Sequence, residues 1–141
     1  MKQDLVKDWM TREVITIPPD ISLPAAHRLM IDHKIRRLPV VKNNKLVGIV
    51  TRGDVRGAKP SEASSLSIWE INYLLAKLKI KDIMTPNPVT VSPEATIEEV
   101  ARIMLEKKIS GLPVVDEGGQ VAGIITESDI FRMVVQGWRQ E

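Results

Sequence analysis

Two copies of a Thr-x-x-Asp pattern offer the clearest binding chemistry in the chain. Thr51 precedes Asp54, Thr126 precedes Asp129, and each pair follows an apolar run that contains a glycine. At the start of a helix, these two side chains can cap the first turn by accepting hydrogen bonds from backbone N–H groups. The same aspartate can accept hydrogen bonds from two adjacent sugar hydroxyls, while the threonine hydroxyl and first-turn amides face an anion. The pattern therefore leaves two interpretations open, a helix cap and a nucleotide site.

The residues before each pair predict a β-hairpin that delivers the chain into a helix. Residues 38–41 and 46–50 are short apolar runs separated by a polar turn, and residues 112–115 and 121–125 repeat the arrangement. Such runs are typical of paired strands. The Thr-x-x-Asp that follows is a helix-start signal, so the hairpins position both aspartates.

The hairpins belong to a longer repeat. Residues 6–17 align with 80–91, and the match continues to the hairpin, where the second copy has one extra residue. Each copy predicts the order strand, helix, strand, strand, helix, which is an α/β (α+β) fold of two β-α-β-β-α repeats. We expect the first copy at 6–58, a connector at 59–79 and the second copy at 80–136. Because each copy alone would be marginally stable, we expect the two to pack together.

The first helix of each copy has its own start signal. Ser22 is the expected N-cap in the first copy. In the second copy Thr96 and Glu99 form a capping box before an apolar helical face. The expected first strands, residues 15–17 and 89–91, are short β-branched runs closed by prolines.

The connector predicts a helix over residues 68–78, after a chain-breaking segment at 57–61 and a small polar run at 61–67. Its apolar residues return at helical spacing: Ile68, Ile71, Leu75 and Leu78. Trp69 and Tyr73 form an aromatic pair four residues apart. We expect this pair to cover the core; the alternative is a subunit interface, where aromatic residues are enriched.

Composition argues against several classes of function. The chain has no cysteine, which excludes disulfides, thiolate metal sites and cysteine nucleophiles. His27 and His33 lie six residues apart, on different faces of a helix, and no phosphate-loop, hydrolase or metalloprotease motif occurs. We therefore predict no enzyme, no metal site and no cofactor.

Charge and hydropathy point to a cytoplasmic protein. The net charge is only +2, and the basic residues form small clusters rather than long stripes with aromatic residues, which disfavours a nucleic-acid partner. No apolar run approaches the roughly 20 residues of a membrane span, and the first residues lack a signal-peptide core. We expect no membrane partner.

Together the repeats resemble a known family. Two copies of Met-Thr, strand, helix, Leu-Pro-Val-Val and Gly-Ile-Val/Ile-Thr-x-x-Asp resemble a tandem pair of CBS domains, the Bateman module, over nearly all of residues 6–135. Residues 64–73 further resemble the connector of acetoin-utilisation-type CBS proteins. The resemblance implies an intramolecular pseudo-dimer with two clefts, often assembled as a homodimer. It implies a non-catalytic regulator that senses an adenosine-containing ligand, AMP, ADP, ATP or S-adenosylmethionine, and acts on a separate partner protein.

The resemblance also implies the residues of each cleft. Phosphate and ribose would contact Thr51 and Asp54 in one cleft, lined by Ile49, and Thr126 and Asp129 in the other, lined by Ile124. Adenine would meet strand residues, namely Ile15, Thr16, Val89 and Thr90. The floor between the clefts would be formed by Ile35, Arg36, Arg37, Ile109, Ser110 and Gly111.

The two copies differ where a ligand would be chosen. Arg36-Arg37 is replaced by Ser110-Gly111, and Arg52 by Glu127. Arginine near a phosphate strengthens anion binding and a carboxylate opposes it, so we expect the cleft built on Asp54 to prefer the more highly charged ligand. Two other functions stay open, a ligand-free interaction scaffold and a nucleic-acid-binding regulator.

Overall fold

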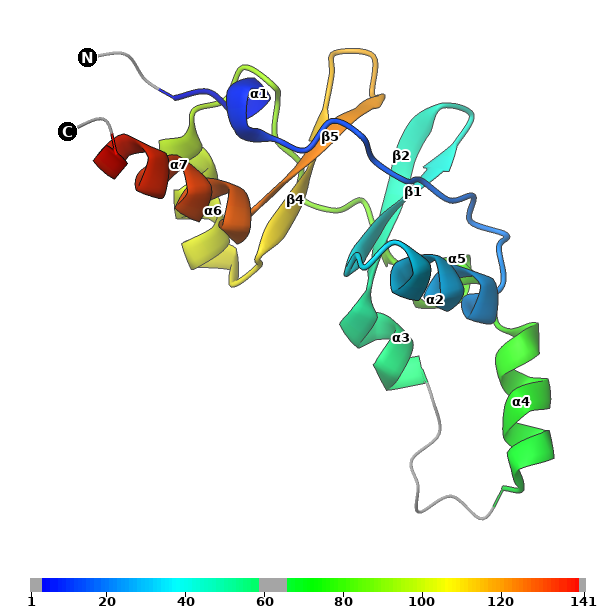
Figure 1. Ribbon diagram of the computed structural model, residues 1–141. Coiled ribbons are helices and arrows are strands. Elements are labelled where there is room, and N and C mark those ends of the chain that lie inside the picture. Colours follow the sequence, from blue (N-terminus) through cyan, green and yellow to red (C-terminus); the bar gives the residue numbers. More distant parts are fainter. Residues whose placement is uncertain (1–3, 59–65, 140–141) are drawn as a thin grey trace. The chain divides into compact units, whose positions relative to one another are not determined.

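A computed structural model describes residues 4–58 and 66–139, which divide into two units (Figure 1). The first unit comprises residues 15–87 and contains Asp54. The second unit comprises residues 1–14 and 88–141 and contains Asp129. The structure is mixed α/β with antiparallel sheets in both units, as the sequence predicts.

The first unit is built on a three-stranded sheet in the order β1-β2-β3. Its elements are α2 (Leu23–Asp32), β1 (Arg37–Lys42), β2 (Lys45–Thr51), α3 (Arg52–Ala58), α4 (Ile68–Lys77), α5 (Ile80–Ile83) and β3 (Thr85–Pro86). Ser22 caps α2 as predicted, because its hydroxyl accepts from Ala25 N at 3.3 Å. The β1-β2 turn uses Asn43 and Asn44 with φ of 53° and 63°, the backbone that a two-residue hairpin requires.

The second unit has a two-stranded sheet, β4-β5. Its elements are α1 (Val6–Trp9), α6 (Ile97–Lys107), β4 (Gly111–Val115), β5 (Val121–Thr126) and α7 (Glu127–Arg139). Thr96 caps α6 by accepting from Glu99 N at 3.1 Å. Glu99 makes no return bond to Thr96 in the part of the chain that the structure describes, so the predicted capping box is only half formed.

The strands predicted at 15–17 and 89–91 are wrong in length. Each is reduced to one parallel bridge, Ile17 to Val40 and Val91 to Val114. Ile17 donates to the carbonyl of Pro39 at 3.0 Å and accepts from Val41 N at 2.8 Å. Pairing ends there because the next residues, Pro18 and Pro19, have no N–H to continue a ladder.

The helix predicted in the connector is confirmed as α4, but its aromatic pair does not cover the core. Trp69 is 80% exposed and Tyr73 is 61% exposed, with Lys77 Nζ lying 4.2 Å from the tyrosine ring centre. Leu75 and Leu78 pack on the core instead. The helix has no fully buried residue, and part of the predicted breaker, residues 59–61, lies outside the described residues.

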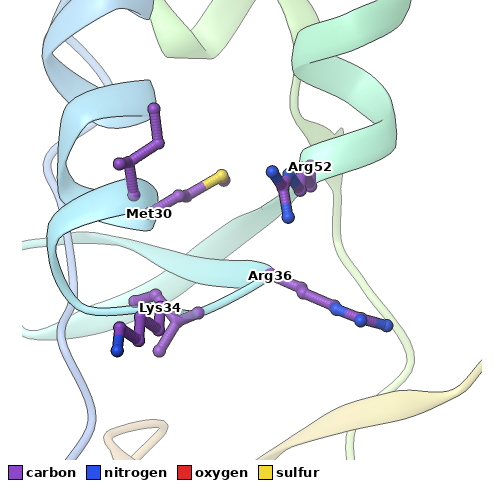
Figure 2. A pocket seen from close by; sticks show the side chains of 6 residues that line it. Met30, Lys34, Arg36 and Arg52 are labelled. Atoms are coloured by element: carbon purple, nitrogen blue, oxygen red, sulfur yellow. The ribbon is translucent and has the colours of Figure 1, made fainter.

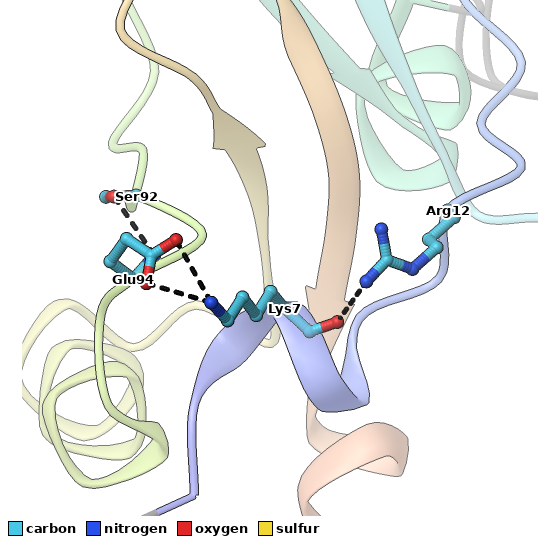
Figure 3. Close-up of polar contacts among 4 residues, drawn as sticks. All are labelled: Lys7, Arg12, Ser92 and Glu94. Carbon is cyan, nitrogen blue, oxygen red and sulfur yellow. Dashed lines mark hydrogen bonds and ion pairs between the residues drawn. The ribbon is translucent and has the colours of Figure 1, made fainter.

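The start of each repeat packs with the hairpin of the other repeat. In the second unit, Val6 N donates to Ala95 O at 2.9 Å and Thr11 pairs with Ile124 of β5. Lys7 Nζ forms an ion pair with Glu94 at 3.1 Å, and Arg12 donates to Lys7 O at 2.8 Å (Figure 3). Segment 6–14 is thereby fixed to the second repeat.

In the first unit, α5 holds the corresponding position. Ile80 N donates to Ile21 O at 2.9 Å, Lys81 N donates to Pro19 O at 2.9 Å, and the Ile80 side chain is fully buried. Thr85 pairs with Ile49 of β2. Each unit therefore combines most of one sequence repeat with the first residues of the other repeat.

Candidate functional site

Thr51 and Asp54 form a reciprocal cap at the start of α3. Asp54 Oδ2 accepts from Thr51 N at 2.8 Å, and Thr51 Oγ1 accepts from Asp54 N at 3.1 Å. The cap interpretation of this pair is therefore correct as structure. Asp54 is half-buried, and its Oδ1 has no partner among residues 4–58 and 66–139. One carboxylate oxygen thus remains available to accept from a ligand.

Asp129 is held differently. Its Oδ2 accepts from Thr126 N at 2.9 Å and from Thr126 Oγ1 at 3.2 Å. Its Oδ1 accepts from Arg132 Nη2 at 2.7 Å, and the residue is only 3% exposed. Arg132 also donates to Trp9 O at 3.2 Å. Both carboxylate oxygens are therefore occupied within the protein.

A pocket of about 280 Å³ lies at the carboxyl end of α2 and the start of β1 and α3. Figure 2 shows side chains from all three segments around it: Met30, Ile31, Lys34, Ile35, Arg36 and Arg52. The side chains of Lys34, Arg36 and Arg52 have no ion-pair partner in the described part of the chain. Three unpaired cations around one hollow favour an anionic ligand.

Backbone pairing joins this pocket to the Thr51 cap. Arg52 N donates to Arg36 O at 2.8 Å, and Arg37 pairs with Thr51 across β1 and β2. Ile49 lies two residues earlier on β2, 8% exposed. The first unit therefore brings Arg36, Arg37, Thr51 and Asp54 to one end of the hairpin.

The second unit repeats this arrangement with other side chains. Glu127 N donates to Ser110 O at 3.0 Å, and Gly111 pairs with Thr126. The positions of Arg36 and Arg52 are thus taken by Ser110 and Glu127. The same end of the hairpin carries a carboxylate and a hydroxyl instead of two guanidinium groups.

The remaining predicted residues are strand and loop positions. Ile15, Thr16 and Ile35 belong to the first unit, and Val89, Thr90, Ile109 and Ile124 to the second. Ile15 and Ile35 pack against the core of the first unit, and Ile109 against that of the second. Val89 and Thr90 are exposed, and Ile124 pairs with Thr11.

Sequence reasoning missed several residues at these sites. Lys34, Met30 and Ile31 line the pocket, although the run around Lys34 had the signature of ordinary solvated surface. Arg132 was also missed; its one available signal is its place three residues after Asp129 on a helix, where side chains meet.

Two kinds of site find no counterpart in the described residues. Nowhere in residues 4–58 and 66–139 do three or more His, Cys, Asp or Glu side chains gather as they would around a metal ion. Within the same ranges, no helix has the length and apolar character to cross a membrane.

Curated relatives share the repeat. The CBS domain model matches residues 6–61 and 80–136. Inosine-5'-monophosphate dehydrogenase of Korarchaeum cryptofilum is 42% identical over 125 residues, which is 89% of this chain and 23% of the dehydrogenase. A CBS domain-containing protein of Dictyostelium discoideum is 34% identical over 94% of this chain and 92% of its own length. The chain spans about a quarter of the dehydrogenase and similarly small parts of several other relatives.

Solved structures share the fold. The CBS domain pair of protein MJ0100, in complex with 5'-methylthioadenosine and S-adenosyl-L-methionine, has a TM-score of 0.80 and 34% identity over 96% of this chain and 99% of that one. CBSX2 in complex with AMP, a protein of Arabidopsis thaliana, has a TM-score of 0.77 and 33% identity, over 94% and 97% of the two chains.

A protein of Vibrio cholerae assigned to acetoin utilization, AcuB, has a TM-score of 0.79 and 32% identity over 98% of this chain and 95% of that one. This agrees with the connector resemblance found in the sequence. Since the family model matches both repeats and the fold follows solved CBS pairs over nearly its whole length, the chain belongs to the CBS domain family, as a tandem CBS pair.

Proposed function

We propose that this CBS pair is a non-catalytic regulatory module that binds an adenosine-containing ligand at sites built on Asp54 and Asp129. The observation that carries the proposal is an Asp54 carboxylate oxygen that has no partner among the described residues, in the same unit as a pocket lined by three cations that are likewise unpaired there. A diol acceptor beside an anion subsite matches the two polar ends of a nucleotide. The solved pairs bound to AMP and to S-adenosyl-L-methionine support this choice of ligand.

Each group has a part in binding. Asp54 Oδ1 accepts from a ribose hydroxyl, and Lys34, Arg36 and Arg52 attract the phosphates. We assign the contact with adenine to Ile15 and Thr16 in the first unit and to Val89 and Thr90 in the second. Ile35 and Ile49 line the first site, and Ile109 and Ile124 line the second. Arg37, Thr51, Ser110, Gly111 and Thr126 complete the proposed lining.

The two sites differ in charge, and we propose that they differ in ligand. The first unit presents Arg36 and Arg52 where the second presents Ser110 and Glu127. A multiply charged nucleotide such as ADP or ATP is therefore favoured at the Asp54 site. A ligand with less negative charge, AMP or S-adenosylmethionine, suits the Asp129 site.

Regulation requires a ligand with unequal affinity for two arrangements of the module. We propose that occupancy is passed to a protein partner, with the module acting as a cytoplasmic homodimer. In the dehydrogenase relative the matching segment is only 23% of the protein. A CBS pair can therefore form part of a larger enzyme, and the partner here can be a separate chain or a covalently linked domain.

Thermal unfolding tests the proposal. Protein stripped of bound ligand is heated with AMP, ADP, ATP or S-adenosylmethionine; a ligand at 100 times its Kd stabilises the native state by about 2.7 kcal/mol. We expect a higher Tm with at least one ligand, and a smaller shift in Asp54→Asn. Asp20→Asn, an exposed residue before the amino end of α2 and away from the pocket, is the matched control and should respond as the unmodified protein does.

Two other outcomes would identify the alternative functions, a ligand-free interaction scaffold and a nucleic-acid-binding regulator. A protein shown to be ligand-free that responds to none of these compounds is a scaffold, in which Thr-x-x-Asp serves only as a cap. Binding to DNA or RNA that weakens steeply with salt would indicate a nucleic-acid regulator.

A further inference from the structure

Within the described residues, Asp54 and Asp129 differ in one contact, an ion pair that is formed in only one of the two repeats. Both carboxylates accept from the backbone N–H of their threonine, at 2.8 Å for Asp54 and 2.9 Å for Asp129. Among residues 4–58 and 66–139, only Asp129 of the two also binds a cation, Arg132, whose Nη2 lies 2.7 Å from Oδ1. The oxygen that is available on Asp54 is therefore occupied on Asp129.

The difference follows from a single position. Arg132 stands three residues after Asp129, and the residue three after Asp54 is Gly57. Gly57 lies on α3, where a Cβ would meet no atom within 4 Å. The first unit therefore has room for a Cβ at this position, where the second unit carries an arginine.

The contact can open without unpacking the core. The Arg132 side chain is 52% exposed while the Asp129 side chain is 4% exposed, so the guanidinium can move into solvent while the carboxylate stays in place. Its second bond, to Trp9 O at 3.2 Å, is also at the surface. Opening would release the tie between α7 and the end of α1.

We propose that Arg132 is a latch that competes with the ligand for Oδ1 of Asp129. The inference rests on the proposed function, because it assumes that the aspartates accept ribose hydroxyls. A ribose diol entering the second site must displace the guanidinium, whereas one entering the first site meets an open oxygen. Arg132 therefore determines specificity: it sets the Asp129 site to a lower affinity and couples its occupancy to the position of α1.

Calorimetric titration with adenosine tests the latch. Adenosine has the diol and no phosphate, so loss of the Arg132 charge cannot weaken binding by removing a phosphate contact. In an Asp54→Ala background only the Asp129 site remains. We expect Arg132→Ala in that background to raise adenosine affinity about tenfold or more, the worth of a hydrogen bond to a charged group. With 2',3'-dideoxyadenosine, which lacks both hydroxyls, Arg132→Ala should leave the affinity unchanged.

The converse substitution gives an independent test. Gly57→Arg should place a latch on Asp54 and weaken adenosine binding at the first site by a similar factor, while Gly57→Gln, without the charge, should not. Circular dichroism establishes that each variant is folded, and Arg132→Gln, which keeps most of the side-chain stem, replaces Arg132→Ala if the latter is not.

The possible results distinguish failure of the latch from failure of the proposed function. Unchanged or weaker adenosine binding after removal of Arg132 overturns the latch alone, the weaker result making Arg132 a ligand contact. Failure of the unmodified protein and every variant to bind adenosine, AMP, ATP or S-adenosylmethionine overturns the proposed function, and the latch with it.

Discussion

The carbonyl oxygen of Thr11 lies so close to Gly123 that a methyl group on this glycine would fall 2.6 Å from it. The glycine of β2 has a related environment, since a methyl group on Gly48 would lie 2.5 Å from Sδ of Met84. Each glycine allows the Met-Thr segment of the other repeat to approach its hairpin. A glycine is therefore needed inside the second apolar run of each repeat, because the Met-Thr segment of the other repeat packs directly against it.

We predict that Gly123→Ala destabilises the protein by about 1–3 kcal/mol, the usual cost of overpacking a fitted site. The carbonyl of Thr11 is backbone and cannot move away without disturbing its bridge to Ile124. Gly48→Ala should cost less, because the Met84 side chain can change rotamer and the nearest backbone atom, Thr85 O, would lie 3.0 Å from the methyl group instead of 2.6 Å. Urea unfolding monitored by circular dichroism measures the free energies.

Gly137→Ala is the matched control for these substitutions. Gly137 lies in α7, and a methyl group on it would have no atom within 4 Å, so alanine should stabilise the helix by up to about 1 kcal/mol. Equal behaviour of Gly123→Ala and Gly137→Ala would contradict the packing argument.

Much of the fold could be predicted from the sequence because the same pattern of strands and helices occurs twice in the chain. The hairpins, the helices that follow them and α4 are where periodicity and capping residues place them. The exchange of residues 6–14 and 80–87 could not be predicted, since both segments have the same pattern and either repeat offers an equivalent surface. Only the assembled contacts, such as Val6 with Ala95, decide between them.

The candidate site, too, could be predicted from the sequence only in part. Thr-x-x-Asp identifies both aspartates, and the basic residues Arg36 and Arg52 mark the more positive unit. The sequence shows Gly57 and Arg132 at the matching positions three residues on, but it could not show that Arg132 pairs with Asp129, because that contact depends on side-chain rotamers. Nor could it show that Trp69 faces solvent, since helical spacing does not reveal which faces of α4 are covered.

The ion pair predicts unequal stability effects at the two aspartates. Asp129→Ala removes a buried acceptor of three hydrogen bonds, while the released Arg132 side chain is half-exposed and stays hydrated, so we expect a loss of about 2 kcal/mol, the upper end for a helix cap. Asp54→Ala removes only a cap contact and should cost about 1 kcal/mol. The same unfolding titrations measure both.

The double variant Asp129→Ala with Arg132→Ala tests whether the ion pair causes the difference. If it does, the double variant should be more stable than the sum of the two single effects predicts. Strict additivity would show that the two side chains are not energetically coupled.

The charge difference between the units predicts a change in ligand preference. Arg52→Glu, which copies the residue at position 127, should weaken ATP binding at the Asp54 site about tenfold or more, because it removes a cation from the pocket and adds an anion. Calorimetry with ATP and adenosine separates charge from folding, since adenosine affinity should stay unchanged. An equal loss for both ligands would instead indicate a damaged pocket.

A row of exposed apolar side chains on α7 predicts where the proposed homodimer forms. Phe131 is 63% exposed and Trp138 is 68% exposed, and with Val134 and Val135 they share one face of the helix at i, i+3, i+4 and i+7. Phe131→Ser with Trp138→Ser should shift the protein toward monomer in sedimentation velocity, whereas Trp69→Ser on α4 should not. Exposed positions such as these change stability little, so dissociation would report the interface. Dissociation by Trp69→Ser alone would place the interface on α4, and a monomeric unmodified protein would contradict the homodimer itself.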